Sequence, residues 1–299
     1  MAQTAADPVE PLLAAAAGSP QPVYLVHGDL VLAEPAGRRL AEGLAAAAGC
    51  QVHCHRHAHG LGQVLADLQT LSLFEPAKVT LVVDSAVLAD RRAAADLVDT
   101  AADVAPVEPG AELSPKERQA ASRLLQVLRL HDLNPDTGES QALLAALPEE
   151  TLAGGEAFRK SRNGRGRGKR QVEQLREDQA SLVEAARGAG LTGQSGSDLG
   201  ELSRAIHEGL PAGHSLVLVE RAAAPEHPLV RALEERRAAV AVGNLEEDRR
   251  GVLQGLDLLA RELERQTGVG IRPDALQELA RRTLRQERDR RGAPAGIDA

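Results

Sequence analysis

Aromatic residues are almost absent from this sequence. Its 299 residues include no Trp, one Tyr and two Phe, so aromatics make up only 1% of the chain. Because 43% of the residues are hydrophobic, a core can still form, but it has to be built from Leu, Val and Ala. Phe74, which lies next to a predicted turn, is therefore an unusual use of a scarce residue.

Cysteine, long apolar runs and an excess of basic residues are also lacking. Cys50 and Cys54 are the two cysteines, and they do not make a disulfide framework. No apolar run approaches the roughly 20 residues of a membrane span, and the N-terminus lacks the cationic start of a signal peptide. The net charge of −8 excludes a basic nucleic-acid binder at the level of the whole chain. We therefore expect a cytoplasmic protein with no membrane partner.

Strands and helices alternate along much of the chain. Apolar or alternating runs predict five strands, at 22–29, 50–58, 78–85, 214–221 and 238–244. Apolar residues at helical spacing predict helices at about 35–48, 61–71, 199–210 and 228–236. This alternation indicates an α/β fold with a parallel, doubly wound sheet.

The chain divides into an α/β domain and smaller parts. Residues 1–20 are expected to form a loose leader, and 21–243 the α/β domain. Residues 108–198 interrupt this domain as an insertion with helices of its own, at about 114–130 and 171–188. After residue 244 only helical patterns remain, so 244–299 is predicted to be a small helical domain, inside or just after which the chain stops.

The first predicted strand ends at Gly28 and is followed by a helix, which is where a phosphate-binding P-loop would lie. A working loop has the pattern G-x-x-x-x-G-K-[ST], because backbone N–H groups wrap the phosphates and a Lys reaches them. Here the second Gly is replaced by Ala33, the Lys by Glu34 and the hydroxyl residue by Pro35. Asp84 keeps an acidic residue at the end of the third strand. We interpret this as the frame of a nucleotide-binding fold without its nucleotide site; the alternative is a strand-exit glycine in an unrelated fold.

Four segments, in this order, carry a resemblance to a known family. They are VYLVHGD, LADLQTLSLFEPAKVTLVVDSA, SLVLVERA and GVGIRPDALQELARRTL. They resemble the delta subunit of bacterial DNA polymerase III, a subunit of the clamp loader, over about residues 21–107 and 199–290. The resemblance implies an AAA+ type five-stranded parallel sheet that does not hydrolyse ATP, followed by an all-helical lid domain.

The resemblance also implies a clamp-binding pair. In the family, two apolar residues at the turn after the second helix enter a pocket on the ring-shaped sliding clamp (the beta subunit) and open it. In this sequence they are Leu73 and Phe74. Fully burying a Leu or Phe is worth roughly 1.5–3 kcal/mol, which suits such an anchor. The alternative is that the pair closes the core beneath the helix.

The resemblance further implies a role in DNA replication without catalysis by this chain. It would be a component of the DNA-directed DNA polymerase holoenzyme, a nucleotidyltransferase complex, with the other clamp-loader subunits and primed DNA as further partners and no cofactor. No G-x-S-x-G and no nucleophile–base set is present, so no catalytic site of its own is expected. Compared with the family, we expect the C-terminal collar domain to be absent, and formation of a loader pentamer stays an open alternative.

A basic segment lies inside the insertion. Seven of the twelve residues 159–170 are Arg or Lys, and the rest are mostly Gly, so we expect disorder there. These cations are candidate contacts to nucleic acid, the alternative being a solvated loop. They are Arg159, Lys160, Arg162, Arg165, Arg167, Lys169 and Arg170.

Two Cys and four His within residues 50–59 suggest a metal site, but the pattern argues against one. On a strand, His53, His55 and His57 lie on one face and Cys54 on the other, and ligands from one extended strand rarely converge on an ion. We predict no metal site. A P-loop-type ATPase of another kind and a metal-binding module remain the alternative functions.

Overall fold

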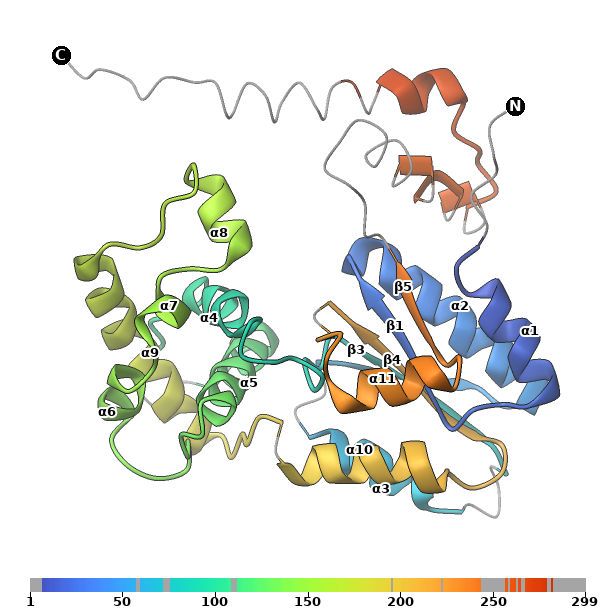
Figure 1. The fold of residues 1–299 in the computed structure, drawn as a ribbon, viewed down its shortest axis with the longest axis horizontal. Helices are drawn as coiled ribbons and strands as arrows, with labels where there is room; N and C mark the ends of the chain where they lie inside the picture. Colours follow the sequence, from blue (N-terminus) through green and yellow to red (C-terminus); the bar gives the residue numbers. More distant parts are fainter. Residues whose placement is uncertain are drawn as a thin grey trace.

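The computed structural model describes residues 7–57, 60–71, 76–108, 112–194, 196–221, 223–242, 256–257, 259–261, 263–264, 267–278 and 281. These residues form an α/β unit and a helical unit that lie side by side (Figure 1). Among the helices in these ranges, none is long and apolar enough to cross a membrane.

Five parallel strands form a single sheet, which confirms the predicted α/β fold class. The strands are β1 (Val23–Gly28), β2 (Val52–Arg56), β3 (Lys78–Val83), β4 (His214–Glu220) and β5 (Ala239–Val242). Their spatial order is β2-β3-β4-β1-β5. Every residue of β3 and β4 is buried, as expected for parallel strands that are covered on both faces.

The strand order places β1 between β4 and β5. Val26 of β1 is in register with Val219 on one side and with Val240 on the other. This order differs from the dinucleotide-binding order 3-2-1-4-5-6 and from the flavodoxin-like order 2-1-3-4-5. Because all five strands are parallel, their carboxyl ends meet at one edge, where open α/β sheets generally bind their ligands.

Helices cover both faces of the sheet. On one face, α1 (Glu10–Gly18) packs on α2 (Leu30–Ala48), and α2 contacts β1, β3, β4 and β5. The other face carries α3 (Leu61–Gln69), α10 (Gly196–Glu208) and α11 (Pro228–Glu235). The core between these layers consists almost entirely of Leu, Val and Ala, as the composition predicts.

Helix α2 begins earlier than predicted. From the sequence, Pro35 is predicted in the first turn of a helix at about 35–48, whereas the helix begins at Leu30 and contains Pro35 in its interior. The Asp29 carboxylate caps this earlier start by accepting a hydrogen bond from the Val31 N–H at 2.9 Å. Pro35 is tolerated because the carbonyl that it leaves unpaired belongs to Val31, a residue that is 59% exposed and open to water.

The N-terminal segment differs from the loose leader expected over residues 1–20. Within its described part, α1 packs on α2 with Val9 and Leu12 buried in the core of the α/β unit. The close approach depends on Gly43, because a Cβ atom there would lie 2.5 Å from the Leu13 side chain. The expectation is therefore corrected: residues 10–18 are an integral helix of the fold.

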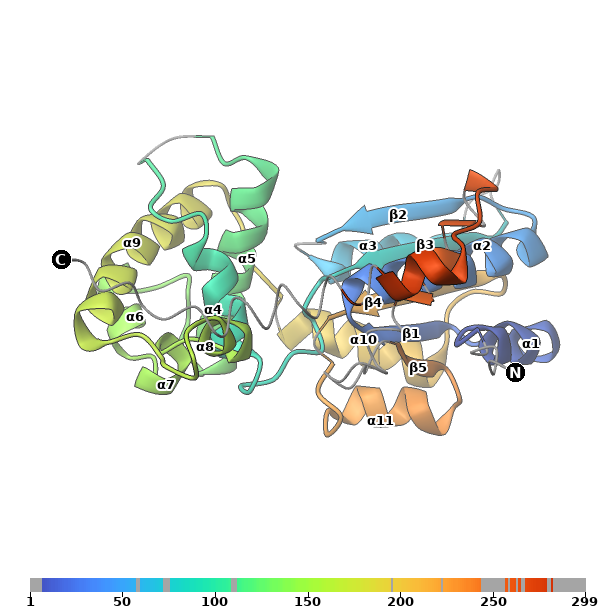
Figure 2. The same cartoon turned by 90° about the horizontal axis from the view of Figure 1, so that it is seen from above.

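The insertion is a folded helical unit with its own core, beside the carboxyl edge of the sheet (Figure 2). Its helices are α4 (Ala94–Ala102), α5 (Pro115–Leu130), α6 (Ser140–Ala145), α7 (Glu149–Leu152), α8 (Glu156–Ser161) and α9 (Lys169–Gly188). Core residues run from Ala86 to Ala186, so the unit begins well before the predicted boundary at residue 108.

The basic segment, residues 159–170, is ordered, which corrects the expectation of disorder. Its first residues belong to α8 and its last two begin α9. The prediction rested on the Gly-rich composition of the segment. Composition does not reveal the contacts of Arg167 with Asp99 and Phe158, which hold the segment in place.

The helical lid predicted for residues 244–299 lies largely outside the described residues. The structure describes short pieces of this region, among them a helical stretch at 273–278. Leu259 packs against the core of the α/β unit. A separate lid domain therefore stays a prediction.

Candidate functional site

The junction between β1 and α2 is where a phosphate loop would be required. Gly28 has φ +132°, and a Cβ atom there would lie 1.9 Å from the carbonyl oxygen of Val242 in β5. Glycine is therefore required at this position by the close approach of β5, whether or not a phosphate ever binds.

No loop separates the strand from the helix at this junction. Asp29 follows Gly28 directly and caps α2, and its carbonyl oxygen accepts the N–H groups of Leu32 at 2.9 Å and Ala33 at 2.7 Å. The N-terminus of a helix attracts anions, but here the Asp29 carboxylate already lies at that position. A phosphate would have to displace this carboxylate.

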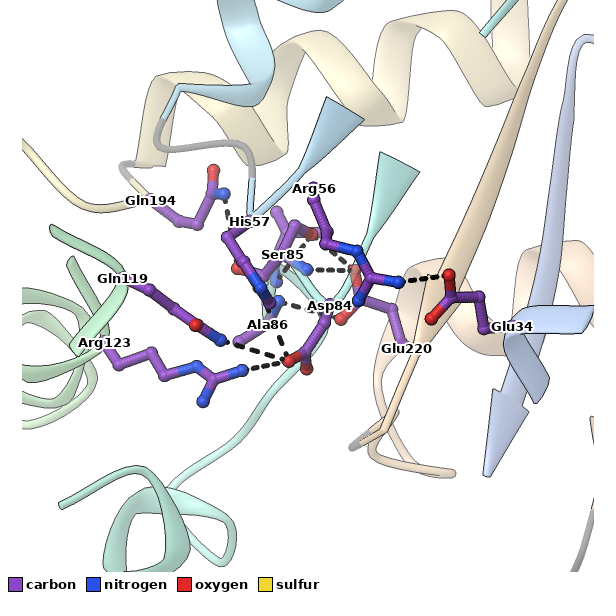
Figure 3. Close-up of polar contacts among 11 residues, drawn as sticks. Glu34, Arg56, His57, Asp84, Ser85, Ala86, Gln119, Arg123, Gln194 and Glu220 are labelled. Carbon is purple, nitrogen blue, oxygen red and sulfur yellow. Dashed lines mark hydrogen bonds and ion pairs between the residues drawn. The ribbon is translucent and has the colours of Figure 1, made fainter. Parts of the chain in front are cut away.

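The remaining residues of the degenerate loop are part of α2. Ala33 is buried in the core, and Pro35 lies inside the helix. The Glu34 carboxylate lies 3.7 Å from Arg38 and forms a close ion pair with Arg56 at the end of β2 (Figure 3). A negative charge with two cationic partners thus lies where a P-loop would present its Lys.

A buried ion pair lies at the carboxyl edge of the sheet. Asp84, which follows β3, forms a close ion pair with Arg123 from α5, and the two side chains are only 5% and 7% exposed. The Gln119 amide lies beside Arg123 and His57, and Nδ1 of His57 lies 3.6 Å from the Asp84 carboxylate (Figure 3). Burial lowers the pKa of His57 below 6.5, so the ring is neutral near pH 7 and Arg123 is the charged partner of Asp84.

A second buried carboxyl group lies beside this pair. Glu220, the last residue of β4, is completely buried and accepts hydrogen bonds from the N–H groups of Ser85 at 3.2 Å and Ala86 at 2.8 Å. The Ser85 hydroxyl makes a further close contact with the same carboxyl group. Burial raises the pKa of Glu220 to about 8, against the lowering effect of these hydrogen bonds, because an ionised carboxylate is poorly solvated there.

These groups join the two units instead of lining a ligand pocket. The cavity between Asp84, Arg123 and Gln194 has a volume of about 10 Å³, which is room for no more than one water. Gln126 donates to the Ala86 carbonyl, and Gln194 donates to the Ser85 carbonyl at 3.3 Å. At the carboxyl edge of the sheet, where a ligand would usually bind, most of these polar groups instead make contacts between the helical unit and the sheet.

Sequence reasoning singled out Asp84 but missed its partners. Ser122, Arg123 and Gln126 are buried polar residues in α5, a helix that otherwise presents Ala, Leu and Val to the core. Glu220 is likewise a charged residue at the end of a continuous apolar strand. A polar residue within an apolar stripe is the signal that could have identified these contacts.

The turn predicted to bind the clamp follows α3, at the opposite edge of the sheet. The end of α3 is fixed from the sheet side, because the Lys78 ammonium group donates to the Asp67 carbonyl at 3.1 Å and lies 3.0 Å from its carboxylate. His214 contacts the Leu68 carbonyl through Nδ1 at 2.6 Å. Leu71, just beyond the helix, is 73% exposed. Leu73 and Phe74 lie outside the described residues.

The histidines and cysteine of β2 do not converge. His53, Cys54 and His55 are exposed along β2, whereas His57 turns into the Asp84 cluster with φ +53°. Within the described residues, no group of three or more His, Cys, Asp or Glu is placed to hold a metal ion. The basic segment lies in the helical unit, away from both the β1–α2 junction and the end of α3 (Figure 1).

Comparisons with protein-family models, with curated proteins and with solved structures find no match. Any functional assignment therefore rests on the residues and geometry of the chain itself.

Proposed function

We propose that this chain is a delta-like clamp-loader subunit that binds and opens a ring-shaped sliding clamp during DNA replication. On this proposal, the α/β unit is an AAA+ type domain that has lost its nucleotide site. Residues 244–299 form its helical lid, and the other loader subunits are its partners. The chain has no catalytic site of its own.

The observation that carries the proposal is the fixed, exposed end of α3. Lys78 and His214 hold the last turn of the helix through the carbonyls of Asp67 and Leu68. Leu71, two residues after the end of α3, is 73% exposed to solvent. A fixed helix end followed in sequence by the apolar residues Leu73 and Phe74 supports a protein-binding anchor, because the helix end itself loses little conformational freedom on docking.

The β1–α2 junction supports the second part of the proposal, that the chain does not use ATP. The Asp29 carboxylate occupies the N-terminus of α2 and would repel a triphosphate, and Glu34 stands where a P-loop has its Lys. On this proposal the chain binds the clamp, and the other loader subunits carry out any ATP hydrolysis.

The test is a calorimetric titration of the cognate sliding clamp with the wild-type chain and with Phe74→Ala. Loss of a buried Phe anchor should weaken binding by roughly 10- to 100-fold, corresponding to about 1.5–3 kcal/mol. Val31→Ala is the matched control: it truncates an apolar residue that is 59% exposed and lies at the opposite edge of the sheet from the end of α3. It should leave the affinity unchanged.

Equal affinities of the wild-type and Phe74→Ala chains for the clamp would contradict the proposal that Phe74 binds it. Tight binding of ATP by the isolated chain would instead favour the alternative of an ATPase of another kind. It would require Asp29 to move away from the N-terminus of α2.

A further inference from the structure

The basic segment of the helical unit has no role in the proposed clamp contact. Seven cations in twelve residues stand out in a chain with a net charge of −8. We propose that the basic segment binds the phosphate backbone of a nucleic acid without regard to base sequence. This inference does not depend on the clamp proposal.

One of the seven cations holds the segment in place. The Arg167 guanidinium pairs with Asp99 and lies 4.0 Å from the centroid of the Phe158 ring, and its side chain is 10% exposed. The Arg167 N–H donates to the Ala153 carbonyl at 2.7 Å. Arg167 therefore anchors the segment to the helical unit and is not available to a ligand.

The other six cations are exposed at the surface. Lys160 pairs with Glu156 at 2.7 Å. For the remaining five, no ion pair with another residue is found in the part of the chain that the structure describes. These five are Arg159, Arg162, Arg165, Lys169 and Arg170.

The backbone fixes the turn from which these cations project. Asn163 and Gly164 adopt left-handed conformations, with φ +54° and φ +80°. The Gly164 N–H closes the turn by donating to the Arg159 carbonyl at 2.8 Å. Cations that project from a fixed turn lose less backbone entropy on binding than cations on a flexible chain.

The placement of two of the cations is unfavourable for the fold itself. Lys169 and Arg170 occupy the first turn of α9, which contains no acidic residue. The positive end of the helix dipole disfavours cations at this position. Arg159, Arg162 and Arg165 lie nearby and have no ion pair within the described residues, although Arg162 also lies 4.8 Å from the centroid of the Phe158 ring. A bound anion would offset the repulsion among these charges.

Phosphate groups of a nucleic acid suit this surface better than a membrane does. Five of the seven cations are Arg, whose planar guanidinium group binds phosphate in a bidentate manner. Within the described part of the helical unit, no large hydrophobic residue is exposed that could insert into a bilayer. The acidic remainder of the chain would repel a nucleic acid elsewhere and so confine contact to this loop.

The experiment measures fluorescence anisotropy of a labelled short duplex DNA of arbitrary sequence, with a single-stranded oligonucleotide in parallel. Affinity is followed between about 50 and 200 mM salt. If the five unpaired cations engage phosphates, log K should fall against log salt with a slope of about −4.5. Arg162→Gln/Arg165→Gln should make this slope shallower by about 1.8 and weaken binding roughly tenfold or more.

Two variants control for folding and for overall charge. Arg236→Gln/Arg237→Gln removes the same charge from exposed positions after α11 and should leave the slope unchanged. Arg162→Lys/Arg165→Lys retains the charge and should keep most of the slope. An unaltered circular dichroism spectrum verifies that each variant folds.

Three outcomes would overturn the proposal. The first is that the wild-type chain binds neither oligonucleotide, and the second is that the Gln variant matches the Arg236→Gln/Arg237→Gln control. The third outcome is binding to phosphatidylserine vesicles, but not to DNA, that is lost in the Gln variant, which would assign the segment to a membrane surface. A clamp titration that still succeeds in any of these cases would leave the clamp proposal standing.

Discussion

At the scale of single residues, the buried ionisable side chain of Glu220 at the carboxyl edge of the sheet makes a testable case. Glu220 is completely buried, and it accepts hydrogen bonds from the N–H groups of Ser85 and Ala86. Burial raises its pKa from 4.5 to about 8. Between these two values the folded state keeps a proton that the unfolded state has lost.

Stability should therefore fall as the pH rises from about 4.5 to about 8 and then level off. The shift corresponds to a loss of up to about 5 kcal/mol, at about 1.36 kcal/mol per pKa unit. Glu220→Gln keeps the position neutral, so its free energy of unfolding should lack this decline relative to wild type. Urea unfolding at several pH values measures the difference.

The exposed Glu177 in α9 provides the control for Glu220. Glu177→Gln makes the same change in composition, and its stability should follow the wild-type pH profile. If Glu220→Gln also runs parallel to wild type from about pH 5 to pH 8, the buried carboxyl group is not protonated in the folded state.

At the scale of elements, the strands were predictable and the helix starts less so. Continuous apolar runs identified β1, β3, β4 and β5, because a parallel sheet that is covered on both faces admits few polar residues. The exposed strand β2 was identified from its alternating pattern instead. The start of α2 was missed because Pro35 suggested a first turn. Asp29, six residues before Pro35, supplies the cap, so the helix begins at Leu30. The Asp29 cap, and not the first-turn preference of Pro35, therefore sets where the helix begins.

A substitution at Gly28 tests how closely β1 and β5 pair. A Cβ atom at this position would lie 1.9 Å from the Val242 carbonyl, and φ +132° is strained for any residue with a side chain. Gly28→Ala should therefore cost more than about 2 kcal/mol in free energy of unfolding, since β5 has to move away. Gly18→Ala, where no atom lies within 4 Å, should be within about 0.5 kcal/mol of wild type.

Denaturant unfolding of the two glycine variants makes this comparison. Similar stabilities for Gly28→Ala and Gly18→Ala would mean that β5 does not pair closely with the end of β1. In that case Gly28 could again be considered as part of an anion-binding loop.

At the scale of the whole molecule, two cores are joined through a polar contact. The core of the α/β unit and that of the helical unit are separate clusters of Leu, Val and Ala. Asp84 and Arg123, which are 39 residues apart in sequence, connect them. The sequence predicted the insertion but not this junction, because nothing local indicates which α5 side chain meets which strand end.

Removal of Arg123 should destabilise the junction strongly. Arg123→Met leaves the buried carboxylate of Asp84 without its charged partner, and the expected loss is about 3–5 kcal/mol in free energy of unfolding. Arg91→Met is the matched control, because Arg91 and Asp132 form an ion pair 2.6 Å long whose side chains are 61% and 86% exposed. Such an exposed pair contributes about 0–1 kcal/mol.

Guanidinium unfolding followed by circular dichroism compares the two arginine variants. Equal losses for Arg123→Met and Arg91→Met would show that the Asp84–Arg123 pair does not hold the units together. An Asp84→Asn/Arg123→Met double variant should recover part of the loss, because it removes the unpaired charge.

For the whole molecule, we propose the frame of a nucleotide-binding fold in which Asp29 lies where a phosphate would bind, and we propose that the exposed end of α3 leads into a clamp contact. Calorimetric titration of the cognate sliding clamp with the wild-type chain, with and without Mg²⁺–ATP, tests this proposal most directly. We expect binding in the absence of nucleotide, with an affinity that ATP does not change. Absence of binding, or binding that requires ATP, would contradict it.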